Sequence, residues 1–214
     1  MTYPAHSDRV VGVTQRVDKI SGRHETRDAL DQNLVEWLCL TGFVPVPIPN
    51  RLAVGGHAGS GIASLDDWLA AVSPSAVILS GGNDLGEVPE RDRLEWALLD
   101  WAEGRNVPVL GICRGMQSLG ARAGGKLVKV PGHIRTVHDL GAPDAWPGRV
   151  NSYHAWSFVE APPGYEVLAK SSDGVIEAMR HHRLPWEGWM WHPEREMPFR
   201  KTDAERLLRL MKRG

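Results

Sequence analysis

The sequence predicts an α/β fold in which helices cover a doubly wound, mostly parallel sheet. Short apolar, β-branched runs alternate with amphipathic segments up to about residue 125, a pattern typical of successive βαβ units. The chain has 214 residues, 42% of them hydrophobic, and no repeat or low-complexity tract divides it. We therefore expect one domain, spanning residues 1–214, with a single sizeable core.

The apolar runs predict the strands. In chain order these runs are 9–14, 43–50, 75–84 and 107–112, and further strands dominate after residue 125. The run FVPVPIPN (43–50) is broken by prolines, which an edge strand tolerates because one of its sides needs no ladder hydrogen bonds. Ligands of such sheets bind outside the carboxyl ends of the strands, so the glycine turns at 81–82 and 111–115 should meet there.

The amphipathic segments predict the helices. These segments are 26–42, 64–71, 91–105, 114–123 and 202–213. Ser64 and Asp67 are spaced to cap the second helix, and Thr202 and Glu205 are spaced to cap the last. The segment 15–25, between the first strand and the first helix, is expected to be a polar loop.

Composition argues against several classes of partner. The net charge is −1, so neither nucleic acid nor an anionic membrane is an expected partner. No apolar run approaches the roughly 20 residues that span a bilayer, and the first residues lack the order of a signal peptide. Cys39 and Cys113 form no CxxC motif and no disulfide framework. We expect a cytoplasmic protein with reduced thiols.

Cys113 lies in Gly-Ile-Cys-Arg-Gly (111–115), between a predicted strand and a predicted helix. Glycines on both sides relieve crowding at such a bend, and the N–H groups that begin the helix favour a thiolate. The backbone N–H groups of Arg114 and of Gly82, in the other glycine turn, are candidates for an oxyanion hole. An ordinary tight turn at Gly82 and a merely buried thiol at Cys113 are the alternatives. Cys39 is expected to be such a packing residue.

A base for this nucleophile is predicted in GWMWHPERE (188–196). Pro193 disfavours a helix at His192, and residues two apart on an extended segment face the same way. Glu194 can then orient the imidazole of His192. Either residue alone would be interpreted as surface, but with a cysteine at a strand–helix turn the pair predicts a nucleophile, a base and an orienting carboxylate.

Four motifs resemble those of the class I glutamine amidotransferase superfamily, in particular its γ-glutamyl hydrolase-like branch. In order they are SGGND, GICRGMQ, VNSYH and WHPERE, and they extend from position 80 to beyond position 194. The resemblance implies a flavodoxin-like three-layer sandwich with a mostly parallel central sheet. It also implies a triad of Cys113, His192 and Glu194 that attacks a γ-glutamyl amide, forms a glutamyl-thioester and is released by water.

The same resemblance implies further site residues. Gln117, Asn151, Ser152 and His154 are expected to contact the glutamyl group, although His154 also suits a purely structural role at a strand end. No metal and no organic cofactor is implied. The remaining histidines show no spacing typical of metal ligands.

The segment TQRVDKISGRHETRD (14–28) bears on the leaving group. It follows the first strand, so it should lie at the edge of the sheet that holds the site, where Arg16 and Arg27 could bind phosphate or carboxylate. A solvated charged loop is the alternative.

This segment and the catalytic motifs together are similar to the γ-glutamyl-CDP-amidate hydrolases of bacterial capsule phosphoramidate synthesis, although Thr26 stands where a second arginine is expected. That similarity implies a nucleotide-linked substrate. Three alternatives stay open: a glutaminase subunit that supplies ammonia to a synthase partner, a hydrolase of another γ-glutamyl amine, and a non-hydrolytic relative. The intact His192-Pro193-Glu194 argues against the last.

Overall fold

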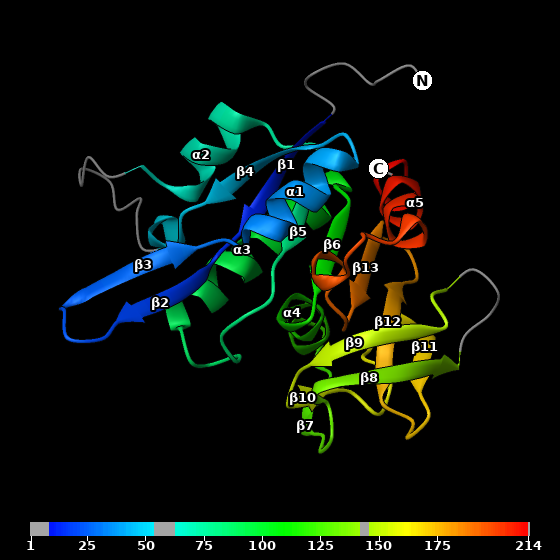
Figure 1. The fold of residues 1–214 in the computed structure, drawn as a ribbon. Helices are drawn as coiled ribbons and strands as arrows, with labels where there is room; N and C mark the ends of the chain where they lie inside the picture. Colours follow the sequence, from blue (N-terminus) through cyan, green and yellow to red (C-terminus); the bar gives the residue numbers. More distant parts are fainter. Residues whose placement is uncertain (1–8, 54–62, 142–145, 214) are drawn as a thin grey trace.

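A nine-stranded mixed sheet forms the centre of the computed structural model, which describes residues 9–53, 63–141 and 146–213 (Figure 1). From edge to edge the strands are β4 (Val44–Ile48), β1 (Val10–Thr14), β5 (Ala76–Leu79), β6 (Val109–Ile112), β13 (Trp186–Trp189), β12 (Ile176–His181), β11 (Tyr165–Ser171), β8 (Ile134–Gly141) and β9 (Arg149–Tyr153). The strands from β4 to β13 run parallel, and those from β12 to β9 are antiparallel. The proline-containing run is an edge strand, as predicted.

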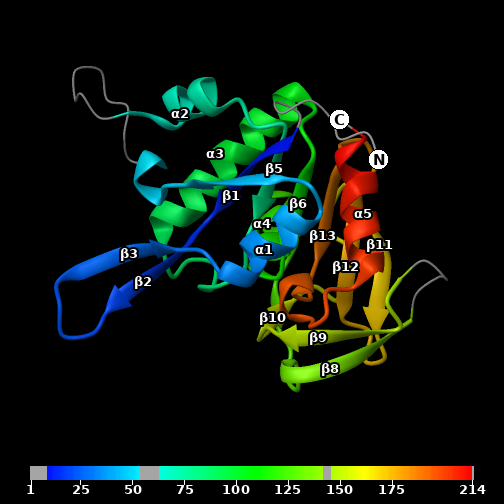
Figure 2. The same cartoon turned by 45° about the horizontal axis from the view of Figure 1, so that its top comes forward.

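Helices cover both faces of the parallel half (Figures 1 and 2). One face carries α1 (Gln32–Leu40) and α5 (Lys201–Met211), and the other carries α3 (Pro89–Arg105) and α4 (Arg114–Arg122), with α2 (Leu65–Val72) and the short turn η2 (Asn50–Ala53) beside α3. The expected three-layer α/β architecture is confirmed. Strands β5 and β6 are buried at every position, which is why their sequences are continuous apolar runs.

Close backbone packing fixes α4 against the sheet. A Cβ atom added to Gly115 would lie 2.1 Å from the carbonyl oxygen of Leu79, and one added to Gly111 would lie 2.5 Å from the carbonyl carbon of Gly115. Only glycine allows α4 to approach β5 and β6 so closely. Cys113 lies between these two glycines, so this packing also sets the position of its side chain.

The expected polar loop at 15–25 is wrong. Its place is taken by a hairpin of β2 (Arg16–Ile20) and β3 (Glu25–Ala29), which projects from the end of β1 in both views (Figures 1 and 2). No face of this ribbon is fully buried, so its sequence lacks the apolar alternation that predicts a strand. The first helix accordingly begins at Gln32, with Asp31 as its N-cap, and not at residue 26.

Two helix caps were predicted, and the structure has one of them. Ser64 and Asp67 form a reciprocal capping box at the start of α2. The last helix instead begins at Lys201 after an extended Arg200 that makes no side-chain cap, so capping by Thr202 and Glu205 is wrong.

Cys39 is exposed, and not packed as expected, because the buried face of α1 is formed by Leu34, Trp37 and Leu38. Within the described ranges, no helix is long and apolar enough to cross a bilayer. Residues 1–8, on which the expected absence of a signal peptide depends, lie outside those ranges.

Candidate active site

Cys113 occupies the turn between β6 and α4. Its φ of 51° and ψ of −105° lie in a region that non-glycine residues rarely adopt, at a cost of about 1–3 kcal/mol. Its N–H donates to the carbonyl of Trp189 at 2.7 Å, and its carbonyl accepts from the N–H of Gln117 at 3.1 Å. These bonds hold the strained turn and place the thiol, whose residue is only 6% exposed, at the amino end of α4.

His192 and Glu194 form a buried pair beyond the end of β13. Nδ1 of His192 lies 2.6 Å from Oε1 of Glu194. His192 has extended backbone, whereas Glu194 lies in the 3₁₀ turn η3 (Pro193–Arg195). The predicted pairing is therefore present, but a tight turn produces it, and the fully extended segment that was expected is wrong. The contact leaves Nε2 of His192 to exchange a proton with a second group.

The electrostatics of the pair favour a charged imidazole. Burial lowers the pKa of His192, but the negative charges of Cys113 and Glu194 and the hydrogen bonds with both raise it further, to about 10. At neutral pH the imidazole of His192 is therefore charged beside the sulfur of Cys113.

A cavity of about 330 Å³ joins the two glycine turns at the carboxyl ends of the strands. Of the residues expected in the site, it is lined by Gly82, Cys113, Arg114, Gln117, His154 and His192. Gln117 donates from Nε2 to the carbonyl of Trp156 at 2.8 Å, in β10 (Trp156–Ser157), which pairs with β7 (Val128–Lys129). Gly82 has a φ of 85°, and its carbonyl accepts from Arg91.

Asn151 and Ser152 do not line this cavity. The amide of Asn151 accepts from the N–H of His192 at 2.9 Å and donates to its carbonyl at 2.8 Å, so it holds the backbone of His192. The hydroxyl of Ser152 donates to the carbonyl of His133 at 2.7 Å. Both residues were expected to line the glutamyl pocket, but neither lines this cavity. Asn151 instead positions His192, and Ser152 supports the residue that precedes β8.

Among the residues of the cavity wall that the sequence interpretation missed, Tyr153 and Arg195 lie next to His192. Tyr153 packs edge-on against the ring of His192, with 5.7 Å between centroids, and the guanidinium of Arg195 stacks over Tyr153 at 4.6 Å. Arg195 follows the motif glutamate directly, and Tyr153 stands between the motif serine and histidine. Because both residues are adjacent to motif residues in the sequence, that adjacency could have indicated them as site residues.

A buried ionic network lies behind the cavity. Glu95, fully buried on α3, pairs with Arg91 and with Arg114, which also pairs with Asp92. Burial raises the pKa of Glu95, but the guanidinium groups of Arg114 and Arg91 lower it more strongly. Thr14, at the end of β1, donates to the same carboxylate at 3.1 Å. The side chain of Arg114 is thus used to anchor the helix that presents Cys113.

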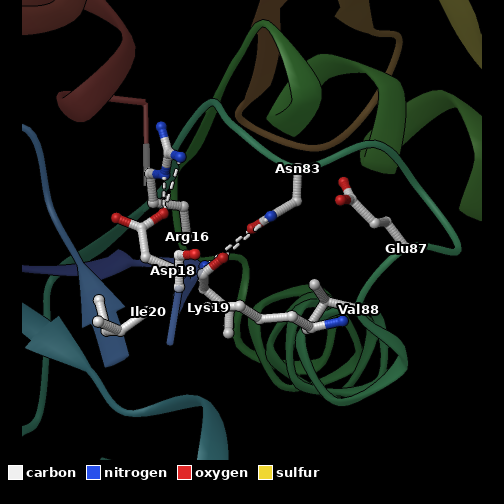
Figure 3. A pocket seen from close by; sticks show the side chains of 9 residues that line it. Arg16, Asp18, Lys19, Ile20, Asn83, Glu87 and Val88 are labelled. Carbon is white, nitrogen blue, oxygen red and sulfur yellow. Dashed lines mark hydrogen bonds and ion pairs between the residues drawn. The ribbon is translucent and has the colours of Figure 1, made fainter. Parts of the chain in front are cut away.

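The structure separates the two arginines expected to bind the leaving group. Arg16, on β2, pairs with Asp18 and lines a pocket of about 470 Å³ with Lys19, Asn83 and Glu87 (Figure 3). The side-chain amide of Asn83 accepts from the N–H of Val17 and donates to its carbonyl, which connects the hairpin to the glycine turn at 81–82.

Arg16 also lines an adjoining pocket of about 240 Å³ with His192 and Glu194. Arg27, on β3, instead lies exposed beside Glu25, at 2.6 Å, and lines none of these pockets.

Comparison with known proteins finds a matching family, similar sequences and similar folds. The family Glutamine amidotransferase class-I matches residues 48–206. A glutamine-hydrolyzing GMP synthase subunit from Thermococcus kodakarensis is 32% identical over 134 residues, which cover 59% of this chain and 69% of the relative. A gamma-glutamyl-gamma-aminobutyrate hydrolase from Escherichia coli is 28% identical over 218 residues, covering 86% and 85%. The crystal structure of a glutamine amidotransferase from Thermotoga maritima has a TM-score of 0.61 at 14% identity and covers 95% of this chain and 84% of its own.

Proposed function

Because the chain belongs to the class I glutamine amidotransferase family, we propose that it cleaves a γ-glutamyl amide with Cys113 as the nucleophile. The observation that carries this proposal is the strained Cys113 turn in one cavity with His192, whose imidazole contacts the buried Glu194. The gamma-glutamyl-gamma-aminobutyrate hydrolase relative, which matches most of the chain, supports hydrolysis.

The proposed reaction uses the thiolate–imidazolium pair. The Cys113 sulfur attacks the γ-carbonyl carbon, and the resulting oxyanion is bound by the backbone N–H groups of Arg114 and Gly82. His192 gives its proton to the departing amine, and a glutamyl-thioester forms. His192 then takes a proton from water, whose oxygen attacks the thioester, and glutamate leaves with regeneration of the thiolate. Glu194 keeps the imidazole oriented throughout.

The experiment is a comparison of two cysteine variants on a panel of γ-glutamyl compounds. Cys113→Ala should lower release of glutamate by about 10⁴-fold or more, since removal of a nucleophile leaves only binding and oxyanion stabilisation. Cys39→Ala, at an exposed thiol outside the cavity, is the matched control and should keep wild-type turnover. Substantial turnover by a folded Cys113→Ala protein would overturn the proposal.

For the leaving group, we propose a phosphate-bearing amine, as in the cleavage of γ-glutamyl-CDP-amidate to cytidine diphosphoramidate and glutamate. Arg16 supports this choice, because it lines the pocket that contains His192 and Glu194, and Lys19 lines the next. Such a substrate would place the protein in capsule synthesis and in the cytoplasm, where thiols stay reduced.

The two arginines of the hairpin test the leaving group. Arg16→Ala should raise KM for a nucleotide-linked substrate, with little effect on a γ-glutamyl substrate that lacks phosphate. Arg27→Ala, in the same hairpin but away from the pockets, should change neither. Equal effects of the two variants, or an equal effect on both substrates, would exclude phosphate recognition by Arg16.

A second candidate is a glutaminase subunit that passes ammonia to a synthase. The GMP synthase relative from Thermococcus kodakarensis favours it. A glutaminase of this kind should show low turnover by itself and a large increase with its synthase, whereas the proposed hydrolase should be fully active without a partner.

A further inference from the structure

A second cluster of chemistry-bearing side chains lies in the antiparallel half of the sheet. His133 directly precedes β8, His138 lies on β8, and Glu177 lies on β12. One ligand atom from each lies within 4.8 Å of the other two. His154, after β9, points Nε2 at the same carboxylate. His133, His154 and Glu177 are almost completely buried, and His138 is half-buried.

The outer contacts of two histidines determine where their protons lie. Nε2 of His133 is 2.8 Å from a carboxylate oxygen of Asp173, and Nδ1 of His154 is 3.2 Å from the carbonyl of Trp156. Both partners are acceptors, so when either ring is neutral this nitrogen is the one that carries its proton. The opposite nitrogens then present lone pairs toward Glu177.

Glu177 itself offers only acceptor oxygens when ionised. Its Oε1 lies 3.5 Å from Nδ1 of His133 and 3.6 Å from Nε2 of His154, beyond hydrogen-bond contact. In the described part of the chain, neither carboxylate oxygen has a hydrogen-bond partner, and neither do Nδ1 of His133, Nε2 of His138 or Nε2 of His154. Unpartnered buried acceptors that face one another are costly, and a cation between them removes that cost.

We propose that His133, His138 and Glu177 bind a divalent transition-metal ion, with Zn²⁺ as the best match. Imidazole nitrogen and carboxylate oxygen are common zinc ligands, with bonds of about 2.0–2.2 Å that place tetrahedral ligand atoms about 3.4 Å apart. The separations of 3.5 Å and 3.6 Å from Oε1 of Glu177 are close to that value. His138 supplies the third ligand atom, within 4.8 Å of the other two, and Nε2 of His154 lies beside the same carboxylate.

The surroundings match a metal centre as well as the ligands do. Metal-binding histidines usually donate their other N–H to a carboxylate or a backbone carbonyl, as His133 does to Asp173 and His154 to Trp156. Mg²⁺ and Ca²⁺ prefer oxygen ligands and fit this set less well. The ion would join β8 to β12 beside His154, which lines the Cys113 cavity; the thioester reaction requires no step from it.

The test is zinc binding by untagged protein, measured by competition with a chromophoric chelator and by metal analysis. One equivalent of Zn²⁺ is expected per chain. His138→Asn should weaken binding by about 100-fold or more, since loss of even an outer-shell partner costs about 10–100-fold. His182→Asn, a histidine outside the cluster, is the matched control and should bind as the wild type does.

A thiolate at Cys113 is the competing zinc ligand, so the same titration is run in Cys113→Ala. Retained stoichiometry there, and a Co²⁺ derivative with d–d bands but no thiolate charge-transfer band, would support the site. Absence of binding, equal binding by His138→Asn, or loss of the zinc in Cys113→Ala would overturn it. None of these readouts depends on turnover, so the site can fail without the hydrolase proposal failing.

Discussion

Replacing Gly115 by alanine should damage both the stability and the activity of this protein. The new Cβ would lie 2.1 Å from the carbonyl oxygen of Leu79 and 2.8 Å from its carbonyl carbon, both backbone atoms of a central strand. Overpacking of a core costs about 1–3 kcal/mol where side chains can move aside, and a backbone carbonyl moves less readily. We expect a loss of about 3 kcal/mol or more in the free energy of unfolding.

The same clash should reach the chemistry, because it separates the two edges of the cavity. Leu79 leads into the turn that holds Gly82, and Gly115 is two residues from Cys113. A misplacement of about 1 Å can cost about 10²-fold in rate, so kcat should fall by that order even in the folded fraction.

Gly104→Ala provides the matched control for this substitution. Gly104 is exposed near the end of α3, and a Cβ there meets nothing within 4 Å. Alanine favours a helix over glycine by up to about 1 kcal/mol, so this variant should unfold at a slightly higher urea concentration than the wild type. If Gly115→Ala unfolds within about 0.5 kcal/mol of the wild type on the same urea scale, α4 does not pack on β5 as described.

Two further predictions concern the base. Asn151→Ala should cost about 1–3 kcal/mol in urea unfolding and lower kcat, because it leaves the buried N–H of His192 without a partner and removes one of two donors from its carbonyl, which keeps the N–H of Arg195. Asn33→Ala, on the exposed side of α1, should change neither, and equal stability of the two variants would show that Asn151 does not hold the backbone of His192. Burial lowers the pKa of His192, but Cys113 and Glu194 raise it from 6.5 to about 10, so its contribution to stability is full below pH 6.5 and is lost as the pH rises through about 10. As the pH rises from 6.5 to about 10, the urea midpoint should therefore decrease in the wild type, and it should decrease less in Glu194→Gln. An identical decrease in the two proteins would show that Glu194 does not stabilise the imidazolium.

The parallel half of the fold could be predicted because its strands are buried on both faces. Runs such as AVIL in β5 are apolar at every position, and each ends at the edge of the sheet where the motifs lie. The β2–β3 hairpin could not be predicted in this way, since its strands alternate charged residues that pair along the ribbon, as Arg16 does with Asp18. Strand formation there depends on the partner strand and not on burial.

The candidate site divides along similar lines. The contact of His192 with Glu194 is local, so spacing alone indicated it. The family resemblance implied that Asn151 contacts the substrate, but a sequence does not give the partner of an amide, and here the partner is a backbone 41 positions away. Likewise, His133 and Glu177 are far apart in the sequence and are brought together by the packing of antiparallel strands. A search for metal ligands at short sequence spacings therefore does not find them.

The position of β13 in the sheet has a consequence for how the enzyme matures. β13 is the last sheet strand in the described chain, yet it lies in the interior of the sheet, between β6 and β12. During synthesis, the parallel and antiparallel halves therefore wait for this strand before they can join, and pairing across so long a sequence separation is slow. Cys113, the proposed nucleophile, emerges from the ribosome well before His192, its proposed base, so a nascent chain holds this cysteine without the imidazole until β13 is inserted.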